Sequence, residues 1–376
     1  MRMPGKFRFT SLFLLMTCVF LFVACGKAQT GVDSRVANIQ LPSGFHIEIY
    51  ASGVLGARSM ALGENGVVFV GTRDEGKVYA LIDDQGSNAN VSVVTVASGL
   101  DTPNGVAFHN GALYVAENSR ILRYDNIMTS LQKSPSPVLV TDALPRERHH
   151  GWRYLAFGPD GKMYVSIGAP YNIGVSDDER FSTIIQMNSD GSGFRVFAAG
   201  VRNSMGFDWD PTARELWFTD NGRDWLGNDL PPDELNHAAR AGQNFGYPYY
   251  YGDNMPDPEF NNHPDPSELV IPARKLGAHV ASLGMKFYTG KMFPAEYRNQ
   301  VFIAEHGSWN RTSPVGYRIS LIRFQNGQAM SYESFATGWL QNIVAWGRPV
   351  DILVMPDGAL LVSDDRANQI YRISYR

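Results

Sequence analysis

Six pairs of short apolar strands recur along this chain and leave few folds open to it. Each pair consists of a run of four or five mostly apolar residues, a polar turn and a second short run. The pairs lie at 67–70 with 77–82, 112–116 with 121–124, 163–167 with 183–187, 216–219 with 233–236, 301–304 with 318–324, and 359–363 with 369–373. Most starts are about 46 to 58 residues apart, and repeats of about 40 to 50 residues built from short strands indicate propeller blades. The sequence therefore predicts an all-β, six-bladed β-propeller.

Turn sequences and one long interval complete this prediction. Pro159-Asp160-Gly161 and Pro356-Asp357-Gly358 precede two of the strands, where proline fixes φ and glycine accepts positive φ. The long interval contains residues 238–280, rich in Tyr, Pro, Asn and Gly, which we expect to be a loop insertion that caps one face. Two stacked β-sandwiches would be the alternative, but the composition shows no linker in mid-chain. We expect a single propeller domain over residues 41–376.

The N-terminus has the pattern of an export signal. Residues 1–25 begin with basic residues, continue as an apolar run from Leu12 to Ala24 and reach Cys25. An apolar run of about a dozen residues is too short for a membrane span. Its end resembles a bacterial lipoprotein signal cleaved before Cys25, although Phe22 stands where leucine is usual. We expect a periplasmic or cell-envelope protein, lipid-anchored at Cys25 or simply cleaved nearby, with a flexible linker at 26–40.

Composition narrows the chemistry of the remaining domain. Cys18 and Cys25 are the two cysteines and both lie in the leader, so the domain can form neither a disulfide nor a thiolate metal site. The net charge of -4 and the lack of a basic run argue against nucleic acid as the main partner. Beyond the leader no apolar stretch is long enough to cross a bilayer. A lipid anchor is therefore the one membrane attachment that the sequence predicts.

Polar clusters fall in the predicted connections between strands, where rigid β scaffolds commonly carry their sites. The clusters are His149 to Arg153, Gly200 to Gly206, Asp220 to Asp224 with Asp233 to Asn236, and Glu305 to Arg311 with Trp346 to Asp351. An imidazole takes and holds a proton near neutral pH, whereas an arginine keeps its charge. His149 and Arg153 therefore suit proton abstraction beside an anion. The alternative is a satisfied loop histidine with an arginine paired to a carboxylate.

The other clusters have the composition of ion-binding sites. The oxygen-rich turn at 220–224 suits a hard cation such as calcium, although its spacing is not that of an EF-hand and a solvated acidic turn is the alternative. Arginines from different blades would form an anion-binding funnel at the pore. The candidates are Arg153, Arg202, Arg348 and Arg311.

Taken in order, these motifs resemble the glucose/sorbosone dehydrogenase family. The motifs are H-x-G-x-R at 149–153, F-G-P-D-G-K-x-Y-V-x-I-G at 157–168, G-x-R-N at 200–203, D-N-G-R-D at 220–224, D-E-L-N at 233–236 and G-R-P-V-D at 347–351. The resemblance covers the chain from about Leu41 to the C-terminus and is greatest to the sorbosone-dehydrogenase-like, lipoprotein-anchored branch. It implies a six-bladed propeller that uses pyrroloquinoline quinone (PQQ) and calcium.

The resemblance also implies catalytic and metal-binding roles. His149 holds the first place of H-x-G-x-R and would be the general base, with Arg153 beside it in the catalytic motif. His150 occupies the variable place and would be a neighbour. Gly222 and Arg223 match the positions whose backbone carbonyls hold calcium.

Cofactor contacts follow from the same resemblance. Arg202 and Asn203 match the quinone-contacting pair, and Arg348 matches a cation on the quinone carboxylates. Arg311 lies near the place of a family lysine or arginine, although its loop does not align cleanly. Asn104 lies where the family often has a cofactor-contacting amide.

The implied activity is oxidation of an aldose or a sugar-derived, sorbosone-like aldehyde, with His149 taking the hydroxyl proton as hydride leaves for the quinone. No C-x-x-C-H haem motif is present, so electrons would pass to a separate acceptor, a cytochrome or a quinone. Tyr247, Tyr249 and Trp225 would stack on sugar or quinone, or else pack within the cap. The alternatives are a calcium-dependent sugar lactonase, which would place acidic side chains at the pore, and a non-catalytic ligand-binding propeller.

Overall fold

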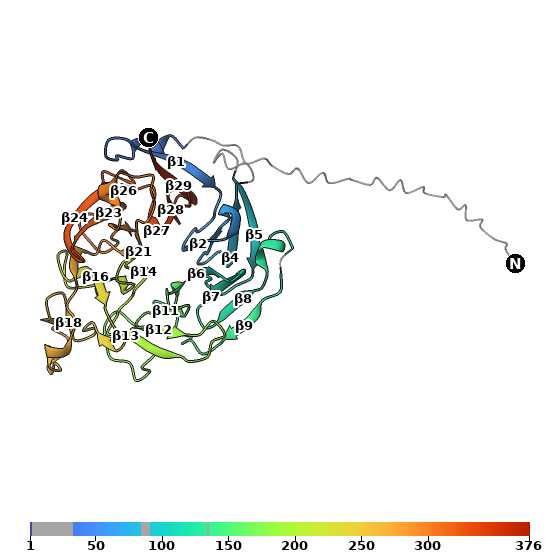
Figure 1. Cartoon of the computed structure of the whole chain (residues 1–376). Coiled ribbons are helices and arrows are strands. Elements are labelled where there is room, and N and C mark those ends of the chain that lie inside the picture. Colours follow the sequence, from blue (N-terminus) through green and yellow to red (C-terminus); the bar gives the residue numbers. More distant parts are fainter. Residues whose placement is uncertain (2–32, 84–90, 134) are drawn as a thin grey trace. The chain divides into compact units, whose positions relative to one another are not determined.

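Six sheets, each built on four antiparallel strands, follow one another around a ring in this computed structural model (Figure 1). The structure describes residues 1, 33–83, 91–133 and 135–376. Cys25, nearly all of the predicted leader and the first part of the predicted linker lie outside the described residues. The prediction of an all-β, six-bladed propeller is confirmed.

Each blade has four main strands, here counted as first to fourth from the centre of the ring outward (Figure 1). The blades are β2 (Met60–Leu62), β3 (Val68–Val70), β4 (Lys77–Ile82) and β5 (Ser92–Ser98); β6 (Gly105–His109), β7 (Ala112–Ala116), β8 (Ile121–Tyr124) and β9 (Val138–Thr141); β10 (Leu155–Phe157), β11 (Met163–Ile167), β12 (Thr183–Met187) and β13 (Arg195–Ala199); β14 (Phe207–Trp209), β15 (Leu216–Asp220), β16 (Pro232–Ala238) and β20 (Arg274–Ala278); β21 (Ser282–Phe287), β22 (Val301–Glu305), β23 (Arg318–Gln325) and β24 (Gln328–Ala336); and β27 (Pro349–Val354), β28 (Leu360–Asp364), β29 (Gln369–Tyr375) and β1 (Phe45–Ser52).

The six predicted strand pairs are the second and third strands of the six blades. The ring closes because β1 pairs antiparallel with β29, from Phe45 opposite Tyr375 to Ser52 opposite Gln369. The N-terminal strand thus completes the blade that the C-terminal strands begin, and Figure 1 shows the two side by side. This pairing covers the free edge of β29, and β1 becomes the outer strand of the blade.

Apolar side chains pack between neighbouring blades, where they form the core. Val68 and Leu81 of the first blade, for example, lie in one buried cluster with Leu361 and Ile370 of the last. Alternate residues of a strand point to opposite faces of its sheet, so each blade packs against both of its neighbours. The burial of these faces holds the loops at the ends of the strands in fixed positions.

The long interval of the sequence, predicted to be a loop insertion, contains short strands. β17 (Gln243–Asn244) adds to β13 in parallel, and β18 (Tyr250–Tyr251) pairs with β19 (Met255–Pro256). β20 is the fourth strand of its blade. The insertion therefore lies between the third and fourth strands of the fourth blade.

The remaining elements are short. They are the hairpin β25 (Leu340–Gln341) with β26 (Val344–Ala345) and the 3-10 turns η1 (Ser34–Asn38), η2 (Glu64–Gly66), η3 (Ile127–Thr129), η4 (Pro266–Glu268) and η5 (Ala295–Tyr297). Gly161 and Gly358 adopt φ of 73° and 93° in the turns that were predicted to need positive φ. Within the described part of the chain, no helix has the length and apolarity to span a membrane.

Candidate active site

The predicted site residues lie on one face of the ring. They occur either between blades or between the second and third strands of a blade. Successive antiparallel strands reverse direction, so both kinds of connection leave the sheets at the same end. The face that carries them is therefore the candidate catalytic face.

His149 and His150 lie in the connection between β9 and β10. The His149 side chain is exposed, and its ring lies 4.1 Å from that of buried His150, centroid to centroid. His150 has a left-handed φ of 49°, and its Nδ1 lies 2.9 Å from the carbonyl oxygen of Ala169. Nδ1–H therefore donates to that carbonyl and fixes the ring. His150 supports the loop, while His149 is accessible to a substrate.

Burial and charge keep His149 neutral. Although the His149 side chain is exposed, partial burial of its ring, and then the charge of Arg202, lowers its pKa below the usual value, and Asp224 opposes this shift. A histidine whose pKa is lowered is unprotonated at neutral pH and accepts a proton. The structure thus brings three of the predicted clusters together around one available base.

Arg153 has a different place from the one expected. Its side chain is buried and donates to three backbone carbonyls, those of Asn118 at 3.0 Å, Pro145 at 2.9 Å and His150 at 3.4 Å. These bonds tie the segment 145–150, which we call the histidine loop, to the neighbouring blade. Arg153 is thus a positioning residue for this loop rather than a group that touches substrate.

Arg202 is held at the edge of the site by polar groups from two connections. Its guanidinium donates to the backbone carbonyl and the side chain of Asn172 at 2.9 and 2.8 Å, and to the carbonyl of Asn221 at 3.1 Å. The carboxylate of Asp224 lies 3.5 Å away. The cation is fixed, and its charge reaches His149.

Asp220 aligns the backbone of the predicted quinone-contacting pair. Its carboxylate accepts from the backbone N–H groups of Arg202 at 2.8 Å and Asn203 at 2.6 Å. Burial nonetheless raises the pKa of Asp220 to about 6. Asn203 itself is nearly buried, with its side-chain oxygen toward Gly168.

The predicted calcium carbonyls fit a hard cation. No described residue donates a hydrogen bond to the carbonyl oxygen of Gly222 or Arg223. Gly222 N–H donates to Asp233, and the Arg223 guanidinium pairs with buried Asp257 at 2.8 Å. Unbonded carbonyls in a held turn are suitable calcium ligands. The described residues contain no cluster of three or more His, Cys, Asp or Glu side chains placed to hold a metal, so such a site would depend on these carbonyls.

A second group, which we call the arginine group, comprises Arg58, Asn104, His306, Arg348 and Asp365. Arg58 lies 2.9 Å from Asp365, whose other oxygen is 2.8 Å from Nε2 of His306. Burial disfavours the charge of Asp365, but His306 and Arg58 hold the pKa of this carboxyl well below its usual range. Burial lowers the pKa of His306 to about 4.

The arginine group contains one cation bonded to neutral groups. The Arg348 guanidinium donates to the backbone carbonyls of His306 at 2.9 Å and Gly307 at 2.6 Å, and lies 5.5 Å over the ring of Tyr317. Its charge also contributes to lowering the pKa of Arg58, whose main cause is burial. This excess of positive charge fits the carboxylates of the quinone.

The side-chain amide of Asn104 forms three hydrogen bonds with other groups of the protein. Its Oδ1 accepts from Arg58 at 2.9 Å, and its Nδ2 donates to Ser59 at 3.1 Å and to the Arg153 carbonyl at 2.7 Å. These bonds give Asn104 a positioning role, and its contact with the cofactor stays a prediction. Arg58 and Asp365 were missed as functional candidates, and His306, within the predicted cluster at 305–311, was given no role, because their pairing joins residues that are distant in sequence.

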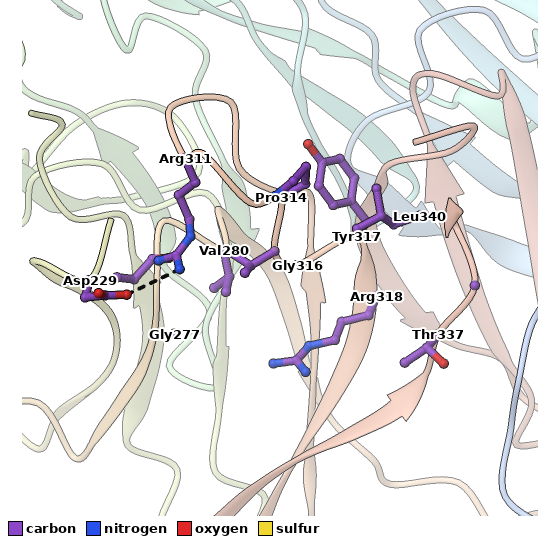
Figure 2. A pocket seen from close by; sticks show the side chains of 13 residues that line it. Asp229, Gly277, Val280, Arg311, Pro314, Gly316, Tyr317, Arg318, Thr337 and Leu340 are labelled. Atoms are coloured by element: carbon purple, nitrogen blue, oxygen red, sulfur yellow. Dashed lines mark hydrogen bonds and ion pairs between the residues drawn. The ribbon is translucent and has the colours of Figure 1, made fainter. Parts of the chain in front are cut away.

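Arg311 lies apart from the arginine group. It faces a cavity of about 540 Å³, where its guanidinium is 3.3 Å from Asp229 (Figure 2). Tyr317, Arg318 and Thr337 also line this cavity. Tyr317 separates it from Arg348, because the tyrosine ring both lines the cavity and lies beneath that guanidinium.

Comparisons with known proteins show the family of the chain and proteins of similar fold. A protein of Borreliella burgdorferi described as uncharacterized is 34% identical over 380 residues, which cover 97% of each chain. The calcium structure of Trichoderma reesei carbohydrate-active enzymes family AA12 has a similar fold, with a TM-score of 0.77 and 20% identity over 94% of this chain and 100% of that chain. The holo form of the pyranose dehydrogenase PQQ domain from Coprinopsis cinerea has a TM-score of 0.74 and 19% identity over 89% and 97%. The family model Glucose / Sorbosone dehydrogenase matches residues 116–372, and the chain belongs to this family.

Proposed function

We propose that this protein is a PQQ- and calcium-dependent oxidoreductase that oxidises an aldose or a sugar-derived aldehyde. Family membership supports an oxidoreductase, and the two structural neighbours are described by their PQQ domain and by calcium. The observation that carries the proposal is the neutral, exposed His149 beside Arg202, on the face that also holds Arg348.

The residues present would hold both groups. Arg202, Asn203 and Arg348 would contact the quinone, and the carbonyls of Gly222 and Arg223 would bind calcium. Bound there, PQQ would supply a hydride acceptor and calcium a Lewis acid. The protein supplies orientation and charge.

His149 carries out the proton transfer. Its imidazole takes the hydroxyl proton of a sugar hemiacetal or aldehyde hydrate, and general-base catalysis of this kind contributes on the order of 10² to 10⁴ in rate. Arg153 holds the histidine loop in place while His149 accepts and releases the proton. The proton then leaves to solvent, since the His149 side chain is exposed.

The test is reconstitution of the mature domain purified without cofactor. We expect reduction of an artificial dye by a panel of aldoses and aldehydes to require both PQQ and calcium. His149→Ala should abolish turnover and leave the Kd for PQQ within a few fold, whereas His46→Ala, on the exposed side of β1, should change neither. Failure of PQQ to bind or to support turnover would contradict the proposal and make lactone hydrolysis the next assay.

Export and electron transfer form part of the same proposal. The protein would be lipid-anchored at Cys25 in the cell envelope and pass electrons to a separate cytochrome or quinone, without a nucleic-acid partner. Incorporation of labelled palmitate in cells that express the full chain would support the anchor. Equal labelling of a Cys25→Ala variant would contradict it.

A further inference from the structure

A hairpin on the candidate catalytic face ends in two exposed apolar residues. β25 and β26 form this hairpin in the connection between the fifth and sixth blades. Ile343 is 76% exposed, the highest value for a large apolar side chain among the described residues apart from Met1, and Val344 is 64% exposed. Asn342 and Ile343 occupy the turn between the strands. Such positions usually hold glycine or polar residues, so the turn itself gives no reason for an isoleucine.

Packing fixes the base of this hairpin. Trp339 precedes the two strands and Trp346 follows them, and both are buried with ring centroids 6.4 Å apart. The indole N–H of Trp346 donates to the carbonyl of Gly338 at 2.8 Å, and its backbone N–H donates to the carbonyl of Trp339 at 2.9 Å. The exposed tip therefore stands on a rigid base. A rigid base loses little conformational entropy when the tip meets another surface.

Other exposed apolar side chains favour the same face. The connections within the fourth and fifth blades expose Trp225, Leu230 and Trp309. Asp229, Arg311 and Leu340 line one cavity, so these connections and the hairpin are neighbours (Figure 2). Among the described residues, the opposite set of connections exposes two large apolar side chains, Phe194 and Ile271. Apolar side chains exposed together on one face are typical of a surface that meets an apolar partner.

The segment that starts at Asp33 lies beside this hairpin. Asp33 accepts a hydrogen bond from the side chain of Gln369 at 3.4 Å, and the Arg35 guanidinium lies 5.0 Å over the ring of Trp346. Gln369 is the first residue of β29 and follows a connection of the catalytic face. The chain that leads back to Cys25 therefore leaves the propeller at the catalytic end of the last blade.

Chain length limits where an anchor at Cys25 can hold the propeller. Cys25 and Asp33 are joined by at most about 30 Å of chain. A blade measures about 26 Å from its catalytic end to its opposite end, as judged from the eight residues of β1. A bilayer against the opposite face would require the joining chain to run almost fully extended along the blade. A bilayer at the catalytic face requires no such extension.

Charge beside the hairpin suits an anionic lipid surface. Arg35 and Arg366 are both exposed. Burial is the main cause of the lowered pKa of Arg348, just past the hairpin, and the nearby charge of Arg366 contributes to it. Asp33 pairs with Arg35 at 2.6 Å, so Arg366 is the one of the two exposed arginines left for a lipid phosphate. An apolar tip beside a cation is typical of a segment that lies on a membrane surface.

We propose that the tip formed by Ile343 and Val344 contacts the lipid bilayer and turns the catalytic face toward it. This inference rests on the anchor at Cys25, which is part of the proposed function, and not on the proposed oxidation. The anchor would bring one defined apolar surface, the bilayer, within reach of the tip.

The first test measures contact in the tethered protein. The ring closes within residues 45–375, so residues 26–376 contain the whole propeller. A histidine tag in place of Cys25 holds them on nickel-chelating vesicles of phosphatidylglycerol and phosphatidylethanolamine. Both native cysteines lie in the leader, so a dye sensitive to its environment can be attached at Ile343→Cys, with Phe194→Cys as the control on the opposite connections.

We expect dye emission at 343 to rise about twofold or more on tethering and emission at 194 to stay unchanged. Equal responses at the two positions, or none at 343, would overturn the inference. A response at 343 that follows protein concentration and not lipid would also overturn it, because the tip would then meet a second copy of the chain.

The second test removes the tether. Residues 26–376 without a tag are mixed with the same vesicles and separated by flotation. Ile343→Ser combined with Val344→Ser should lower the partition coefficient about tenfold. Val138→Ser with Leu139→Ser, a matched exposed pair on the outer strand β9, should leave it within about twofold. Arg366→Gln should lower it about threefold. Equal effects of the two double variants would contradict a contact through the tip.

The contact and the anchor can fail separately. Palmitate incorporation into the full chain without a response at 343 would contradict the contact alone. A response at 343 in a protein whose full chain incorporates no palmitate would contradict the anchor alone. Neither measurement uses PQQ-dependent turnover, so loss of the proposed oxidation would be seen independently. Unfolding midpoints near wild type confirm that the variants fold.

Discussion

Asn104 donates a hydrogen bond from its side chain to the backbone carbonyl of Arg153 at 2.7 Å and thereby joins the arginine group to the histidine loop. The same amide binds Arg58 and Ser59, so one buried residue links three connections around the ring. The two halves of the candidate site are thus parts of one network.

Asn104→Ala should destabilise the protein. Arg58 would lose an acceptor and the Arg153 carbonyl a donor inside the fold, and buried groups left unpaired cost about 1 to 3 kcal/mol each. We expect the free energy of unfolding in urea to fall by about 2 to 4 kcal/mol. Asn262→Ala is the matched control, because Asn262 is exposed, and it should change stability by less than about 0.5 kcal/mol. Equal effects of the two variants would contradict the network.

The pH dependence of turnover should report His149. Burial and Arg202 lower the pKa of this base, so kcat/KM should be constant near neutral pH and fall below a pKa that is under 6.5. Asp224 raises the pKa of His149, so Asp224→Asn should move this acid limb to lower pH. A shift to higher pH would show that another group titrates.

Arg348 and Arg311 should separate in PQQ affinity. Arg348 contacts backbone carbonyls within the arginine group, whereas Arg311 is paired with Asp229 at the side cavity. Arg348→Gln should raise the Kd for PQQ about 10- to 100-fold, since a charge-assisted contact is lost. Arg311→Gln should leave it within about threefold. Isothermal titration of the two variants decides the matter, and the reverse order would place the quinone near Arg311.

His306 should make the fold sensitive to acid. The folded protein protonates this histidine at a pKa of about 4, whereas the unfolded chain does so at its usual value near 6.5, so the unfolded state binds more protons between these values. Stability is therefore full above pH 6.5 and falls as the pH drops toward 4.

His306→Gln should remove much of this dependence, because its amide still donates to Asp365 but does not titrate. The loss of unfolding free energy between pH 7 and pH 4.5 should be smaller than in wild type by roughly 1 to 3 kcal/mol. His46→Gln, exposed on β1, serves as the control. An identical acid loss in wild type and His306→Gln would assign the effect to other groups.

Local patterns identified the strands that have a neighbour in sequence. The second and third strands of each blade form hairpins or near-hairpins. The turn residues between them therefore allow both strands to be predicted. β1 alternates along Phe45 to Tyr50 but was missed, because its partner β29 is at the other end of the chain. β20 was hidden in the insertion for a similar reason, since about 35 residues separate it from β16.

The site residues divide in the same way. His149 and Arg202 stand in compact motifs and were predicted, whereas Arg58 acquires its place through Asp365, over three hundred residues away. Arg311 and Arg348 were both candidates for the anion-binding funnel, although the loop of Arg311 did not align cleanly with the family, and the path of that loop places Arg311 outside the arginine group. Arg153 was expected to face an anion because sequence does not reveal that three carbonyls surround it.

The pairing of β1 with β29 determines when the ring can close during synthesis. β1 leaves the ribosome first among the strands, yet its partner is made last, so its edge stays open until synthesis is nearly complete. The five other blades can form in succession, but the ring cannot lock before the final residues arrive. A shortened chain that lacks β29 would therefore leave the edge of β1 unpaired and be prone to aggregate.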